Sequence, residues 1–165
     1  MAASVLALLA SARPDGDTSR LLDLVLSDVE HETADLFALN LAPYTYGRTE
    51  IDATFLSLAE RMIDADAIVL ATPVYWYSMS GVAKTWLDRL TDLTTIRKEL
   101  GRALAGTSLA VVSTGNDVVA PEGFDVPFRR TADYLDLRYA GIHFQDARLP
   151  YDTAAARAFG ASLVT

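Results

Sequence analysis

Three short and almost unbroken apolar runs constrain the fold of this chain more than any other feature. They are SVLALLA at 4–10, AIVLAT at 67–72 and SLAVVST at 108–114. A strand that is buried on one face alternates apolar and polar residues, whereas a strand of a parallel sheet is covered on both faces and is apolar throughout. The three runs therefore predict the central strands of a parallel sheet.

Helical periodicities and weaker strand patterns fill the intervals between these runs. Two further strand candidates are DLFALNL at 35–41 and LRYAGIHF at 137–144. Apolar residues with the 3.6-residue period of amphipathic helices recur in 21–29, 55–63, 82–90, 128–135 and 153–163. This alternation of strand and helix predicts an α/β fold, a five-stranded parallel sheet with helices on both faces.

Length and charge limit the domain organisation and the class of partner. The 165 residues contain no repeat or linker, which predicts one domain over 1–165. Asp and Glu number 22 against 14 Lys and Arg, a formal net charge of −8, and no basic run interrupts this balance. Because such a surface repels a phosphate backbone, we expect no nucleic-acid partner.

Apolar stretches and cysteine content bear on location. No apolar stretch approaches the roughly 20 residues that cross a bilayer, so we expect no membrane span. The start, MAASVLALLASA, has no Lys or Arg before its short apolar run, unlike a secretory signal. The chain has no cysteine, which excludes disulfides, thiol catalysis and most zinc sites. We expect a cytoplasmic protein without a metal centre.

The loops after the first and third strands are the expected place for a ligand. Open α/β sheets bind ligands beyond the carboxyl ends of strands where the strand order reverses, and in the order 2-1-3-4-5 this point lies between strands 1 and 3. The two loops read SARPDGDTS at 11–19 and PVYWYSMS at 73–80. Both have unusual chemistry at the position that the topology selects.

The first loop is typical of a phosphate site. Ser11, Thr18 and Ser19 offer hydroxyl donors and Arg13 offers a bidentate guanidinium. The following helix adds free N–H groups and the positive end of its dipole. A polar turn with an ordinary helix cap is the alternative interpretation.

Two nucleotide motifs are absent from this loop. It contains only Gly16 of the three glycines in a dinucleotide fingerprint. Its spacing imitates a P-loop, but Ser11 replaces the first glycine and Asp17 the lysine, which argues against an NTPase. We expect Asp17 or Thr18 to cap the helix.

The second loop places Tyr75, Trp76 and Tyr77 in a row behind Pro73. Successive side chains of an extended segment point to opposite sides, so at least one ring faces away from the core. Exposed ring faces and main-chain N–H groups suit a flat heteroaromatic ligand with polar edges. Packing beneath a neighbouring loop or subunit is the alternative. Ser78 or Ser80 is the expected cap of the next helix.

At these residues the sequence resembles the NAD(P)H-dependent FMN reductase and quinone reductase group of flavodoxin-like proteins. SARPDGDTSRL is similar to the group's phosphate loop, and TPVYWYSMSGVAKTWLDRL closely resembles its segment around the flavin ring. STGND at 113–117 is similar to its third flavin loop. The resemblance covers nearly the whole chain in order, and the match at 72–90 is the most specific.

The resemblance implies a flavodoxin-like fold with strand order 2-1-3-4-5, bound FMN, NAD(P)H as co-substrate and a homodimer or higher homo-oligomer. It places on the cofactor Ser11, Arg13, Asp17, Thr18, Ser19, Pro73, Val74, Tyr75, Trp76, Thr114, Gly115 and Asn116. Two positions depart from the group's pattern, which has Gly at Ala10 and Asn at Asp17. An Asp17 carboxylate directed at the phosphate would weaken binding, whereas one facing away would cost little.

The function implied is an FMN-dependent oxidoreductase that passes hydride from NAD(P)H to a small acceptor such as a quinone, free flavin, or nitro or azo compound. Such ping-pong chemistry needs no catalytic side chain, and we expect none. His31, placed near the end of the first helix, and His143 have no ligand cluster beside them. The alternative functions are a flavodoxin-type electron carrier and a flavin-free binding protein. Arg13 argues against the carrier.

Other residues have plainer expected roles. Lys84 and Asp88, four apart on a helix, predict an ion pair, and Arg89 is expected to make helix salt bridges. The loop residues Tyr44, Tyr46 and Arg48 either shape a substrate pocket or pack within their loop. Trp86 is a candidate interface residue.

Overall fold

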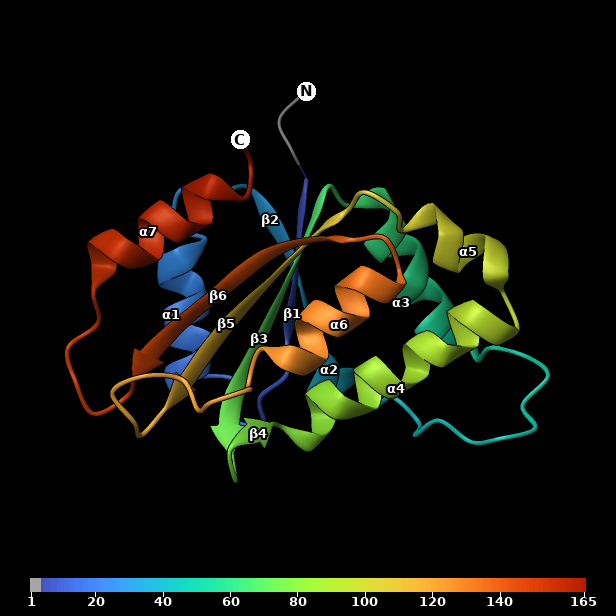
Figure 1. Ribbon diagram of the computed structural model, residues 1–165, viewed down its shortest axis with the longest axis horizontal. Coiled ribbons are helices and arrows are strands. Elements are labelled where there is room, and N and C mark those ends of the chain that lie inside the picture. The colour runs from blue at the N-terminus through green and yellow to red at the C-terminus, as the bar shows by residue number, and fades with distance from the viewer. Residues whose placement is uncertain (1–3) are drawn as a thin grey trace.

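The computed structural model describes residues 4–165, and at its centre lie five parallel strands (Figure 1). The strands are β1 Val5–Leu9, β2 His31–Asp35, β3 Ala67–Tyr75, β5 Ser108–Gly115 and β6 Arg138–Asp146. Their order across the sheet is β2-β1-β3-β5-β6. Apart from the short β4, this is the order 2-1-3-4-5, so the predicted flavodoxin-like α/β fold is confirmed. The first three residues of the signal-like start lie outside the described residues.

Helices cover both faces of the sheet (Figure 1). On one face lie α1 Asp17–Val25 and α7 Thr153–Ser162, which contact each other. On the other face lie α2 Leu36–Leu39, α3 Ala53–Asp64, α4 Gly81–Thr95, α5 Lys98–Ala103 and α6 Val126–Tyr134. The five predicted helices are all present, whereas α2 and α5 were not predicted.

β1 shows why its apolar run is unbroken. Val5, Ala7 and Leu9 belong to the core beneath α1 and α7, while Leu6 and Leu8 belong to the core on the opposite face. All five side chains are buried. The run at 4–10 is therefore apolar throughout because the strand is covered on both faces, as expected for a parallel sheet.

The strand predicted over 35–41 is wrong, because this segment is the short helix α2. The Asp35 carboxylate accepts hydrogen bonds from the N–H groups of Phe37 (2.9 Å) and Ala38 (3.1 Å) and so caps the helix. Asn40 ends it with a left-handed φ of 49°. The true strand, β2, reads HETAD and lies at the sheet edge, where an apolar pattern is not required. His31 is its first residue rather than the end of a helix.

The three aromatic residues form the end of a tight hairpin. β4 Ser78–Met79 turns back on β3 and pairs with it antiparallel, Val74 opposite Met79 and Tyr75 opposite Ser78. The two connecting residues, Trp76 and Tyr77, have φ values of 50° and 64°, as in a type I′ turn. The exposed fractions are 50% for Tyr75, 93% for Trp76 and 73% for Tyr77, so all three rings face solvent.

Two α4 predictions have opposite outcomes. Lys84 and Asp88 form the expected ion pair. Trp86, the candidate interface residue, is only 1% exposed and belongs to the core, so that prediction is wrong.

Candidate functional site

The carboxyl ends of β1, β3 and β5 surround a small cavity of about 110 Å³. They lie at the lower edge of the sheet in Figure 1. Every residue predicted to bind the cofactor lines this cavity except Ser19 and Trp76. Gly16 and Ala147 are further lining residues. Segments that are far apart in sequence thus meet at the point where the strand order reverses.

The first loop leaves the start of α1 open toward the cavity. The N-cap is Gly16, and no side chain caps the helix, so the predicted caps Asp17 and Thr18 are wrong. The Thr18 hydroxyl instead bonds the Thr114 hydroxyl at 2.7 Å, and the Asp17 carboxylate accepts from the Tyr151 hydroxyl at 3.2 Å. Because glycine has no side chain to accept them, the first-turn N–H groups stay available to a ligand.

Gly16 also makes room for the arginine of this loop. A Cβ at Gly16 would lie 3.2 Å from the Cβ of Arg13 and 3.6 Å from its Nε. The Arg13 side chain therefore folds close over the glycine, at the exposed side of the cavity. Ser11 is buried, and its hydroxyl accepts the N–H of Arg13 at 3.2 Å and donates to the Arg13 carbonyl at 3.2 Å. The Arg13 guanidinium and the main-chain N–H groups of α1 thus converge beside the Ser11 and Thr18 hydroxyls, a set of polar groups that fits a phosphate.

Buried hydroxyls tie the three loops together beneath the cavity. Ser80 caps α4 by accepting the N–H of Ala83 (3.1 Å), which confirms one of the two predicted caps, and it donates to the Ala10 carbonyl after β1 (2.7 Å). The N–H of Ser80 donates to Thr72 Oγ1 (3.0 Å), and Ser113 Oγ donates to the Thr72 carbonyl (2.7 Å). These hydrogen bonds connect the ends of β1, β3 and β5 beneath the cavity.

A larger groove of about 620 Å³ shares Tyr75 with the cavity. Its other walls include Leu36 and Phe37 of α2, Leu41, and Val82 of α4. None of the described residues that line it carries a charge. The groove therefore suits an uncharged, apolar molecule next to whatever occupies the cavity.

Tyr44, Tyr46 and Arg48 of the 40–51 segment do not line the cavity. Tyr44 and Tyr46 form an edge-to-face pair with ring centroids 5.4 Å apart. The Arg48 guanidinium donates to the Asp52 carboxylate (3.0 Å) and the Pro43 carbonyl (3.3 Å). These contacts match packing within the loop, one of the two roles expected for these residues, rather than the shaping of a substrate pocket.

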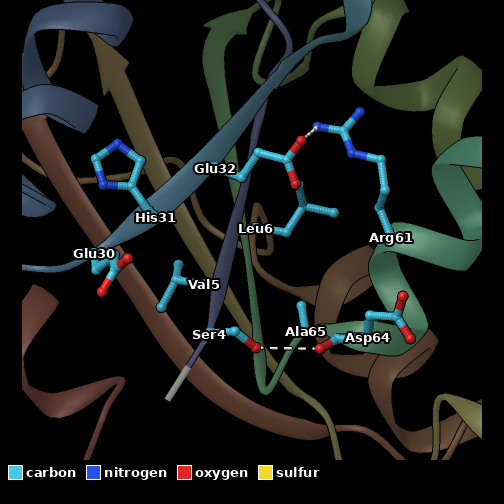
Figure 2. A pocket seen from close by; sticks show the side chains of 9 residues that line it. All are labelled: Ser4, Val5, Leu6, Glu30, His31, Glu32, Arg61, Asp64 and Ala65. Atoms are coloured by element: carbon cyan, nitrogen blue, oxygen red, sulfur yellow. Dashed lines mark hydrogen bonds and ion pairs between the residues drawn. The ribbon is translucent and has the colours of Figure 1, made fainter. Parts of the chain in front are cut away.

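Figure 2 shows another hollow, of about 440 Å³, near the start of β1 and β2. His31 lies there with charged neighbours, among which Arg61 and Glu32 form an ion pair at 2.9 Å. In residues 4–165 no three His, Asp or Glu side chains are grouped to hold a metal. The hollow lies at the opposite edge of the sheet from the strand ends that bind ligands in such folds.

The segment after β6 also contributes to the cavity, which was not predicted from the sequence. Ala147 lines the cavity, and its N–H donates to the Gly115 carbonyl at 2.8 Å. Tyr151 reaches Asp17 from the same segment. The strand order gave a usable signal, because β6 pairs with β5 and the next helix, α7, packs beside α1.

Fold and site together define a flavodoxin-like protein with a donor-rich cavity at the switch point of its sheet. The sequence profile of the NADPH-dependent FMN reductase family matches residues 3–121. The chain belongs to this family.

Relatives with reported names agree with this assignment. A protein of Erythrobacter litoralis named FMN-dependent NADH:quinone oxidoreductase is 34% identical over 96 residues, which are 56% of this chain and 43% of the relative. One of Streptomyces coelicolor with the same name is 31% identical over 117 residues, 69% of this chain and 53% of the relative. The chain thus spans about half the length of these relatives.

Solved structures show the same fold at low identity. The Trp repressor binding protein from Bacillus subtilis has a TM-score of 0.74 at 18% identity, covering 98% of this chain and 97% of that one. The apo form of the NADH:FMN oxidoreductase EMOB has a TM-score of 0.67 at 21% identity, covering 98% and 90%. Among the described residues, no helix has the length and apolar character to cross a membrane.

Proposed function

We propose that this chain binds FMN in the cavity between the first, third and fourth parallel strands and works as an NAD(P)H-dependent FMN oxidoreductase. One observation carries the proposal: loops that were assigned to the flavin from sequence alone line a single cavity, with donors for an anion on one side and Tyr75 on the other. The names of the relatives, FMN-dependent NADH:quinone oxidoreductase, support it.

Each part of the cavity has a distinct role toward FMN. Ser11, Arg13, Thr18 and the first N–H groups of α1 would hold the phosphate. Tyr75 and the main chain of the hairpin would hold the flavin ring, and Thr114, Gly115 and Asn116 would border it from the loop after β5. A Cβ at Gly115 would lie 3.1 Å from the Phe144 ring, so a larger residue there would require this ring to shift.

When bound, FMN supplies the redox chemistry by accepting a hydride from NAD(P)H and passing it to an acceptor. The chain's own residues therefore need to position and to stabilise, and no side-chain acid, base or nucleophile is required. Main-chain N–H groups after Pro73 would stabilise negative charge that develops on the ring. The uncharged groove beside Tyr75 is the proposed place for a small acceptor such as a quinone, free flavin, or nitro or azo compound.

We also propose a homodimer, or a higher homo-oligomer, in the cytoplasm. Trp76, Tyr77, Val118 and Val119 are exposed apolar side chains at the carboxyl edge of the sheet, and such groups mark interfaces. Light scattering coupled to gel filtration tests the oligomeric state directly. Trp76→Ser is expected to shift the protein toward monomer, whereas Tyr134→Ser, at another exposed aromatic residue on α6, is the control.

The decisive experiment is a visible absorption titration with FMN, followed by NADPH and then NADH without oxygen. A perturbed flavin spectrum that bleaches with either nicotinamide is the expected result. Bound flavin that neither one reduces would favour the flavodoxin-type electron carrier, which the acidic net charge of −8 would suit. No binding with FMN in excess would overturn the proposal and favour a flavin-free binding protein.

A further inference from the structure

Among the described residues, Asp17 is the one acidic side chain that lines the cavity. It is contacted by Tyr151, which lies in the segment between β6 and α7. Asp17 is the first residue of α1, and its carboxylate would repel a phosphate bound at the same helix end. The Tyr151 hydroxyl lies 3.2 Å from Asp17 Oδ1 and 3.2 Å from the Asp17 carbonyl oxygen. Its single proton is thus shared between two acceptors on the same residue.

Tyr151 is a better anchor for this carboxylate than its other neighbour. The Arg20 guanidinium lies 3.7 Å from Asp17 Oδ1, and its side chain is 67% exposed, so this ion pair is weak. Tyr151 is half-buried and packs against the core beneath α1 and α7. Burial and the Asp17 charge raise the pKa of the Tyr151 hydroxyl, so it stays protonated and remains a donor.

The neighbours of Tyr151 fix the segment in place. The N–H of Asp152 donates to Gln145 Oε1 at 3.3 Å, and the Asp152 carboxylate caps α7 by accepting the N–H of Ala155 at 2.9 Å. The hydroxyl therefore approaches Asp17 from a segment whose two ends are tied to β6 and α7.

We propose that Tyr151 is a positioning residue that holds the Asp17 carboxylate toward the β6–α7 segment, and so permits a phosphate to bind beside an acidic helix start. This inference rests on the proposed function, since FMN supplies the phosphate. It explains how the chain accommodates an aspartate at the first position of α1, beside a bound phosphate.

The test is a double-mutant cycle with two ligands. Wild type, Tyr151→Phe, Asp17→Asn and the double variant are titrated with FMN and with riboflavin, which lacks the phosphate, and affinity is read from quenching of flavin fluorescence. Tyr151→Phe is expected to weaken FMN binding about fivefold and to leave riboflavin binding unchanged. In the Asp17→Asn background the same change is expected to alter FMN affinity less than about twofold, because no charge remains to be positioned. Tyr134→Phe, an exposed phenol on α6, is the control.

Other outcomes overturn the inference in distinguishable ways. An equal loss of FMN affinity in both backgrounds would assign Tyr151 to packing, and no loss in wild type would remove its role altogether. If wild type bound riboflavin as tightly as FMN, the assignment of the phosphate to this cavity would be wrong. If wild type bound neither flavin, the proposed function itself would fail, and the inference with it.

Discussion

Of the described residues that line the cavity, Arg13 is the one with a cationic side chain. We predict that Arg13→Ala weakens FMN binding about tenfold to a hundredfold, the loss expected for a charge-assisted hydrogen bond. The melting temperature of the variant without ligand should equal that of wild type, since the Arg13 side chain is exposed. Isothermal titration calorimetry measures the affinity, with Arg130→Ala on α6 as a control that removes an equal charge elsewhere. An unchanged affinity would contradict the phosphate assignment.

Tyr77 occupies a backbone conformation that glycine adopts without penalty. Its φ of 64° forces a side chain into the left-handed region, and its ring is largely exposed. We predict that Tyr77→Gly raises the free energy of unfolding by about 0.5–1 kcal/mol, measured in urea without ligand. Tyr77→Ala removes the ring but retains the Cβ, so it should bring no gain. Equal effects of the two variants would show that the ring, not the backbone, is strained.

At the scale of elements, Arg89 joins α4 to the start of α3 and to the preceding loop. Its guanidinium is fully buried and bonds Asp92 (2.7 Å), Asp52 (2.6 Å) and the Ala42 carbonyl (2.9 Å), 4.5 Å from the Phe55 ring centroid. The predicted helix salt bridge is thus part of a cluster that connects three segments.

Removal of this arginine should cost far more than loss of a surface ion pair. We predict that Arg89→Ala lowers the free energy of unfolding by about 3–5 kcal/mol, because it leaves the buried Asp92 carboxylate without its partner. Chemical denaturation measures the loss. Arg89→Met combined with Asp92→Leu should recover part of it, and a double variant as unstable as Arg89→Ala would contradict the explanation.

The same cluster gives stability a defined dependence on pH. Burial raises the pKa of Asp52, but hydrogen bonds from the Phe55 N–H and Arg89 outweigh it, and the pKa lies below its usual value. A lowered pKa stabilises the fold above the unfolded-state pKa, and this contribution is lost as the pH falls through the folded-state value. We predict that Asp52→Asn lowers the melting temperature at pH 7 and that the difference from wild type shrinks below about pH 4.

Sequence patterns located the elements whose burial is complete and missed those that tertiary contacts define. The runs at 4–10, 67–72 and 108–114 became β1, β3 and β5 because both faces of these strands are covered. β2 was missed because an edge strand needs no apolar run, and β4 because its turn contains Trp76 and Tyr77 in place of the usual Asn-Gly signal. In the site, the loop positions followed from strand order, whereas Tyr151 meets Asp17 only through packing of α7 on α1.

For the whole molecule, ligand binding and unfolding are linked. A ligand that binds only the folded state at a hundred times its Kd adds about 2.7 kcal/mol of stability. We predict that FMN at this concentration raises the melting temperature by about 5–11 °C for a chain of this size. Differential scanning calorimetry measures the shift. Arg13→Ala at the same FMN concentration should show a much smaller one, and an equal shift would contradict specific binding at the cavity.

The two edge strands of the sheet, β2 and β6, also differ in the features that limit pairing with a further strand. β2 carries the carboxylates Glu32 and Asp35, and β6 is interrupted near Gly141, where the register with β5 shifts between Leu109 and Ala110. Charged side chains and bulges both discourage a second sheet from adding to an open edge. A protein with one long sheet is thereby protected against edge-to-edge aggregation on both sides, by charge at one border and by irregular backbone at the other.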